Sequence, residues 1–111
     1  MKLEQNFQNH FDKFFEGVKK VYSDYMDLHF PTNPRDSFTY EINSKYIKIV
    51  KNERGYTGGG GSVHCFVEIA TGNVLKAASW KSPVKKNPRS NIFAADFGVS
   101  GLTWCGVKYL R

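Results

Sequence analysis

The sequence predicts an α+β domain in which an N-terminal amphipathic helix packs on a curved antiparallel β-sheet of about five strands. Two observations lead to this fold class. Apolar residues recur at helical spacing over residues 1–30, and from residue 37 onward they alternate with polar residues as in strands. With 111 residues, of which 41% are hydrophobic, the chain has the size and apolar content of a single domain spanning residues 1–111.

The predicted helix occupies residues 1–30. Its apolar positions follow one another at intervals of three or four residues, which places them on one stripe: Leu3, Phe7, Phe11, Phe14, Val18, Tyr22 and Tyr25. Pro31 and Pro34 end the helix near residues 28–30, because proline lacks the amide donor and pushes the preceding residue out of the helical region.

Alternation predicts five strands, at residues 37–42, 45–51, 62–69, 74–79 and 103–110. A loop at 52–62 that contains five glycines and a basic loop at 80–91 interrupt them. Residues 92–97 fit either a helical turn or a short strand.

Side chains that alternate along a strand point to opposite faces of the sheet. This rule puts Ile47, Ile49, Val63, Cys65, Val67 and Ile69 on an inner face. It puts Tyr46, Lys48, Val50, His64, Phe66 and Glu68 on an outer face.

Charge is distributed unevenly along the chain. Residues 1–30 hold four lysines and five acids, a net of −1, whereas residues 31–111 hold twelve lysines and arginines and five acids, a net of +7. Clustered positive charge gains affinity for phosphate by releasing counterions. The sheet half is therefore expected to have an anionic partner.

No residue pattern predicts catalysis, so we expect a protein that is not an enzyme and needs no metal or cofactor. His64 and Cys65 are strand neighbours and are expected on opposite faces, where they cannot act as a base and a nucleophile. Nothing in the spacing of Glu41, Glu68 and Asp96 brings these acids together around a metal. The glycine run lacks the Gly-Lys-Ser/Thr of a phosphate loop, which leaves a mobile hairpin tip or a loop that closes over a ligand.

The feature that favours a function is the mixture of cations and aromatic rings in the sheet half. Single-strand binders that do not read sequence use a positive groove for the backbone and flat rings for the bases. The predicted phosphate contacts are Lys48, Lys76, Lys81, Lys85, Lys86 and Arg89. The predicted stacking groups are Tyr46, Phe66 and Trp80, although Trp80, Trp104, Phe93 and Phe97 also suit a core.

The chain contains three short segments: Lys45 to Val50 (KYIKIV), Ser62 to Val67 (SVHCFV) and Thr71 to Lys81 (TGNVLKAASWK). Together they resemble a pattern in small uncharacterised proteins of tailed bacteriophages. The resemblance covers residues 45–111 and implies a phage origin and the host cytoplasm, but no activity. The long helix stands where a short N-terminus is expected. By fold analogy, a basic sheet backed by a helix is similar to the PC4-like and Whirly single-stranded DNA-binding proteins.

These observations favour a binder of single-stranded nucleic acid, DNA rather than RNA. The alternative is a phage protein-interaction module, such as an inhibitor of a host protein or a virion component. Neither a signal peptide nor a membrane-spanning stretch is expected, and Cys65 and Cys105 are expected as reduced core thiols rather than a disulfide. The aromatic arc of the helix is wide for a small sheet, so we expect a homodimer in which part of the arc packs on a second copy.

Overall fold

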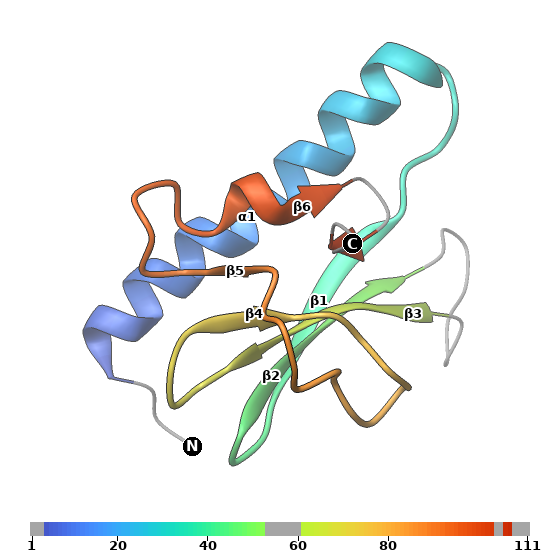
Figure 1. The fold of residues 1–111 in the computed structure, drawn as a ribbon. Coiled ribbons are helices and arrows are strands. Elements are labelled where there is room, and N and C mark those ends of the chain that lie inside the picture. Colours follow the sequence, from blue (N-terminus) through green and yellow to red (C-terminus); the bar gives the residue numbers. More distant parts are fainter. Residues whose placement is uncertain (1–3, 53–60, 104–105, 108–111) are drawn as a thin grey trace.

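The computed structural model describes residues 4–52, 61–103 and 106–107, and it has the predicted α+β architecture (Figure 1). A helix, α1 (Gln5–His29), lies across an antiparallel sheet of five strands in the order β1-β2-β3-β4-β5. The strands are β1 (Ser37–Ile42), β2 (Tyr46–Asn52), β3 (Gly61–Glu68), β4 (Asn73–Leu75) and β5 (Ser90–Asn91). A 3₁₀ turn, η1 (Val99–Gly101), leads into a two-stranded sheet of β6 (Leu102–Thr103) and β7 (Gly106–Val107).

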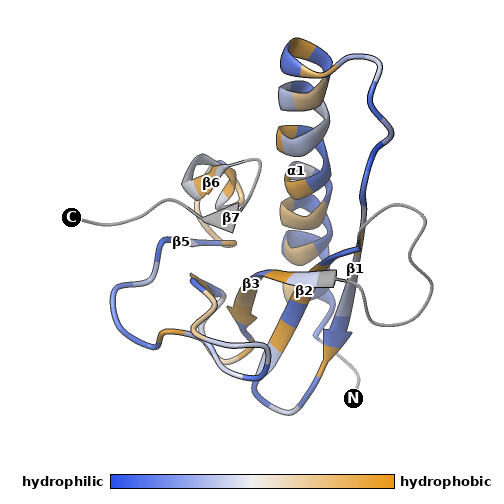
Figure 2. Cartoon of the chain, turned by 90° about the vertical axis from the view of Figure 1, so that its right-hand side faces the viewer, coloured by the Kyte–Doolittle hydropathy of each residue, from blue (hydrophilic) through white to orange (hydrophobic). Residues whose placement is uncertain are grey.

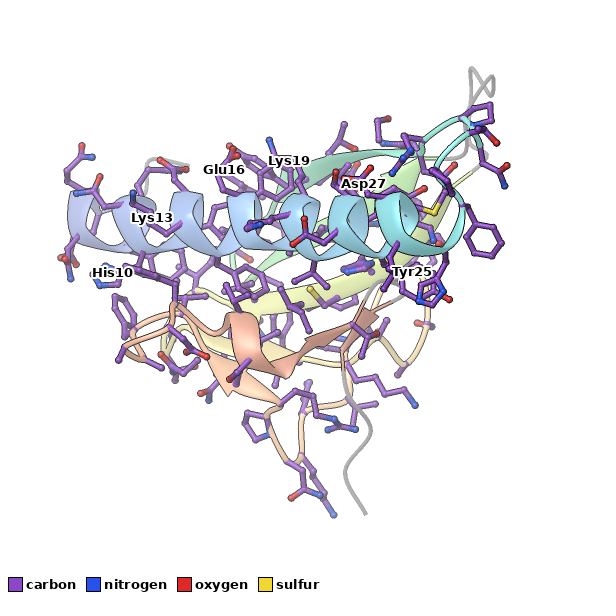
Figure 3. All side chains as sticks on the ribbon, turned by 90° about the horizontal axis from the view of Figure 1, so that it is seen from above. His10, Lys13, Glu16, Lys19, Tyr25 and Asp27 are labelled. Atoms are coloured by element: carbon purple, nitrogen blue, oxygen red, sulfur yellow. The ribbon has the colours of Figure 1, made fainter. Side chains whose placement is uncertain are left out.

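The predicted stripe of α1 forms one half of the core. Phe7, Phe11, Phe14, Val18, Tyr22 and Met26 are buried on it. They meet an aliphatic inner face of the sheet, to which Ile47, Ile49, Cys65, Val67 and Val74 belong. The opposite side of the helix is polar, and its labelled charged residues Lys13, Glu16, Lys19 and Asp27 are exposed (Figure 3). The helix ends at His29, as the following prolines predict.

The two predicted hairpins of the central sheet are confirmed, but its last strands differ from the prediction. The strand predicted at 74–79 ends at Leu75, because the chain turns back there and the Val84 N–H donates to the Lys76 carbonyl at 2.7 Å. The fifth strand is β5 rather than residues 103–110. Of that segment, residues 104–105 and 108–110 lie outside the described residues; Thr103 pairs antiparallel with Gly106, and the preceding Leu102 pairs with Val107.

A β-bulge in β3 overturns part of the predicted face assignment. Ile49 pairs with Cys65 and Val50 with Val63, which leaves His64 without an opposite residue. His64 is only 4% exposed, and its ring lies 5.1 Å from that of Phe38. Phe38 also contacts Tyr22 of α1, so His64 lies on the helix side of the sheet rather than on the outer face.

The outer face of the sheet is covered as well, which was not predicted. Pairing places Lys48 beside Phe66 and Phe66 beside Leu75, on the face opposite the helix. Phe66 and Leu75 are each 1% exposed. The predicted exposure of Phe66 is therefore wrong, because residues 76–89 fold across this face.

The wide aromatic arc of α1 is used within the chain itself. Phe7, Phe11 and Phe14 are core residues, and Phe15 is half-buried with its ring 5.0 Å from that of Tyr40. Tyr25 contacts His29 and Phe30 at the end of the helix. The arc thus gives no reason to place a second copy on the helix.

The buried His64 predicts a specific pH dependence of stability. Burial, with a smaller contribution from the Lys51 ammonium, lowers the pKa of His64 from 6.5 to about 4. Between these values the unfolded chain binds a proton that the folded chain excludes, so stability is full above pH 6.5 and falls as the pH drops toward 4. The expected loss from this residue is about 3 kcal/mol.

Urea unfolding of the wild type and of His64→Phe at a series of pH values tests this prediction. Phenylalanine keeps a ring at the site and cannot take up a proton, so the variant should lack the part of the slope that His64 contributes. Parallel curves for the two proteins across the window would show that His64 does not titrate as its burial implies.

Candidate nucleic-acid interface

The basic segment 76–89 is held as a compact turn over the outer face. An isolated bridge joins Ala77 to Pro83, and the Ala78 N–H donates to the Ser82 carbonyl at 2.9 Å. At the tip, the Ser79 hydroxyl oxygen accepts the N–H groups of Lys81 and Ser82. This turn projects Trp80 and Lys81 outward, and Trp80 is 47% exposed. The stretch that leads from the turn into β5 is strongly hydrophilic (Figure 2).

Lys48 anchors Trp80 from below. Its ammonium lies 4.1 Å from the centre of the indole ring and donates to the Trp80 carbonyl at 3.2 Å. The same ammonium pairs with the Glu41 carboxylate at 3.2 Å, and the Lys48 side chain is only 14% exposed. Lys48 is therefore engaged within the protein, and its geometry does not suit the predicted phosphate contact.

Tyr46 and Lys85, both predicted from the sequence, line one hollow of about 470 Å³. The Asn43 side chain shapes it by accepting the N–H groups of Lys45 and Tyr46 at the β1–β2 turn. The remaining lining residues are Ser44, Lys45, Glu68, Ile69 and Ala70. Sequence reasoning missed Lys45 and Glu68 as site residues, although Lys45 is the immediate neighbour of Tyr46.

The other predicted residues fall into two groups. Lys81, Lys85 and Lys86 are exposed. Lys76 and Arg89 are half-buried, and the Arg89 guanidinium donates to the Asn87 carbonyl. Phe66 is buried beneath Tyr46, with ring centres 5.9 Å apart, so it supports that ring and is closed to a ligand.

The sheet acids have separate partners. Glu41 pairs with Lys48, and Glu68 accepts the Thr71 hydroxyl at 2.6 Å. Asp96 lies in a turn after β5, where hydrogen bonds from Ser100 and Gly98 lower its pKa. Within residues 4–52, 61–103 and 106–107, no three histidine, cysteine or acidic residues are grouped so as to hold a metal ion.

Cys65 carries a free, fully buried thiol whose pKa is raised by burial, whereas Cys105, Trp104 and most of the glycine-rich loop lie outside the described residues. Among the described residues, α1 is too polar for a membrane-spanning helix, and no other helix is long enough.

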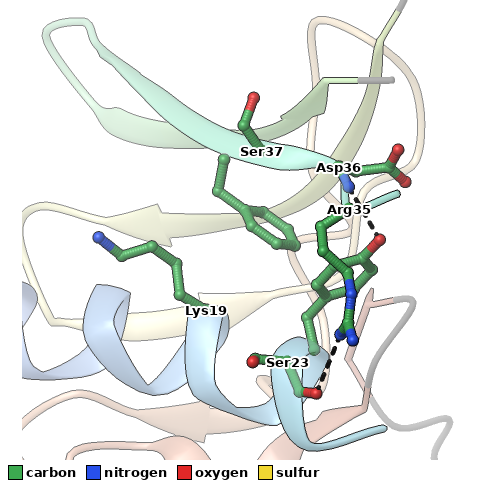
Figure 4. Close-up of a pocket in the computed structure, with 7 residues that line it drawn as sticks. Lys19, Ser23, Arg35, Asp36 and Ser37 are labelled. Carbon is green, nitrogen blue, oxygen red and sulfur yellow. Dashed lines mark hydrogen bonds between the residues drawn. The ribbon is translucent and has the colours of Figure 1, made fainter. Parts of the chain in front are cut away.

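A second hollow, of about 260 Å³, lies between α1 and the start of β1 (Figure 4). The rings of Tyr22 and Phe38 line it, together with Lys19, Ser23, Arg35, Asp36 and Ser37. Its cations already have acidic partners: Lys19 pairs with Glu16 and Arg35 with Asp27, each at 2.9 Å. This hollow is therefore less suited to phosphate than the one beside Tyr46.

Comparison with known proteins gives a family but no activity. No curated protein and no solved structure matches the chain. A family model described as a family of unknown function, DUF7717, matches residues 1–110 and so takes in the helix together with the sheet. The chain belongs to the DUF7717 family.

Proposed function

We propose that this protein binds single-stranded nucleic acid, DNA more than RNA, with little dependence on base sequence and without catalysing a reaction. One observation carries the proposal: the half-buried side chain of Tyr46 lines a hollow together with Lys45 and Lys85. A flat ring beside cations supplies the two elements that sequence-tolerant binding of single strands requires.

Glu68 indicates how a strand is oriented in this hollow. Its carboxylate repels phosphate but accepts hydrogen bonds from the amino groups of bases. A base therefore enters the hollow and stacks on Tyr46, while the adjoining phosphates lie toward the exposed ammonium groups of Lys85 and Lys86.

Trp80 offers a second stacking surface. Since Lys48 lies under one face of its ring, a base stacks on the other face. The contacts of Lys48 with the indole ring and with the Trp80 carbonyl hold this side chain in place before the ligand arrives. Such preorganisation reduces the entropy lost on binding. In this proposal Lys48 positions Trp80 and does not touch phosphate.

The direct test is a salt titration of binding to single-stranded DNA, single-stranded RNA and duplex DNA. The Lys85→Ala/Lys86→Ala variant should bind every single strand more weakly and lower the slope of log affinity against log salt by about 1.4, the value for two phosphate contacts. Lys13→Ala/Lys20→Ala removes two exposed lysines from α1 and should bind like the wild type. If no oligonucleotide binds at low salt, the proposal fails and the protein-interaction module takes its place.

A second test separates stacking from charge. Trp80→Ala should weaken binding by about 1–3 kcal/mol and leave the salt slope unchanged, because stacking releases no counterions. Lys48→Met should also leave the slope unchanged, in contrast to the loop lysines. Thermal melts of both variants check that they remain folded. A reduced slope for Lys48→Met would mean that Lys48 contacts phosphate directly, and a folded Trp80→Ala protein with full affinity would remove Trp80 from the site.

A further inference from the structure

Strand β1 forms an open edge of the sheet. It pairs with β2 on one side, and no strand of the described chain lies along its other side. Five of its six residues are exposed. Tyr40 and Ile42, which are both large and apolar, are each 38% exposed.

The hydrogen-bond pattern identifies the backbone groups on this edge. The Asn43 N–H donates to the Tyr46 carbonyl at 2.9 Å, in register with the β1–β2 ladder. Because bonding alternates along an antiparallel pair, the residues at 37, 39 and 41 also bond to β2. Phe38, Tyr40 and Ile42 therefore direct their N–H and C=O groups away from the sheet.

This edge lacks the features by which proteins prevent edge-to-edge pairing. Edge strands that are protected against pairing usually carry lysine, proline or an inward-pointing charge. The β1 sequence Ser-Phe-Thr-Tyr-Glu-Ile contains neither lysine nor proline. Its one charged residue, Glu41, is paired with Lys48. The strand is instead rich in aromatic and β-branched residues, which favour pairing.

We infer that β1 pairs antiparallel with β1 of a second copy about a two-fold axis at Tyr40. This register opposes Tyr40 to Tyr40 of the second copy, and Phe38 to Ile42. It satisfies two independent requirements of strand pairing at once. The outward-directed backbone groups of the two copies face one another, and the apolar side chains on the helix side of one β1 contact those of the other.

Charge does not prevent a second copy from pairing at this edge. In the same register Glu41 faces Thr39 of the other copy, and the two Glu41 residues lie on the diagonal, about 7–8 Å apart, so no like charges are directly opposed. The two five-stranded sheets then form one continuous sheet with both helices on the same side. This interface replaces the helix contact expected from the sequence, and it does not depend on the proposed nucleic-acid binding.

Cysteine cross-linking tests the register. Under mild oxidation Tyr40→Cys should give a covalent dimer on a non-reducing gel, because directly opposed Cα atoms in a hydrogen-bonded pair lie about 5.5 Å apart, within disulfide reach. Thr39→Cys is the matched control. Position 39 of the other copy is not directly opposite but diagonal to it, with the two Cα atoms about 7–8 Å apart, so Thr39→Cys should cross-link far less. The wild type, with Cys65 and Cys105, gives the baseline, and equal cross-linking at positions 39 and 40 would overturn the register.

The mass of the protein in solution tests the interface itself. Tyr40→Pro and Tyr40→Ala both lose the ring, but only proline also loses the N–H at the two-fold axis, and it breaks no β1–β2 bond. Sedimentation should show a wild-type dimer, and Tyr40→Pro should dimerise about tenfold or more weakly than Tyr40→Ala. A monomeric wild type, or a dimer that both variants leave intact, would overturn the inference.

Discussion

The packing of the α1 stripe on the aliphatic face of β2 and β3 is the interaction on which the rest of the structure depends. Phe11 and Phe14 are fully buried against the layer that contains Ile47 and Ile49. Burial of each such side chain contributes about 1.5–3 kcal/mol to the free energy of unfolding, so this layer supplies most of the hydrophobic stabilisation that a small domain needs. It also commits one face of the sheet to the core, which leaves the opposite face and its covering segment for contact with a partner.

That opposite face is built in two layers. Phe66 and Leu75 make a small apolar layer beneath residues 76–89, and Lys48 lies between Glu41 and Trp80. The segment is rich in lysine and carries no acid, so its own charges repel one another. Its bridge, its turn and the contacts of Lys48 with Trp80 oppose that repulsion. A ligand with regularly spaced negative charges would reduce the repulsion among these lysine and arginine side chains.

Sequence periodicity predicted the elements whose pattern is long and regular. The helix from Gln5 to His29 and the strands around Ile47 and Cys65 follow directly from spacings of 3.6 and 2. The His64 bulge was not predictable, because one extra residue in a strand leaves no mark on an alternating sequence. Short strands such as β5, with two residues, have no period to detect.

The candidate site was predictable in its composition and less so in its contacts. Tyr46, Trp80 and Lys85 were predicted from their aromatic or basic character, and the structure leaves Trp80 and Lys85 exposed and Tyr46 half-buried. The sequence-based prediction that Phe66 is exposed is wrong, and it did not foresee the contacts of Lys48 with Glu41 and Trp80, since alternation gives the face of a residue but not what folds over that face. Lys45 and Glu68 were not predicted to line the hollow, because they come together only through the packing of the β1–β2 turn beside the end of β3.

We propose that the helix side holds the fold together while the opposite face binds nucleic acid. Chemical-shift mapping of the isotope-labelled protein during titration with a short single-stranded oligonucleotide tests it most directly. We expect the amide signals of Lys45, Tyr46 and the non-proline residues of 76–89 to shift, while those of α1 stay unchanged. Shifts confined to α1 or to the hollow beside Tyr22 and Phe38 would contradict it.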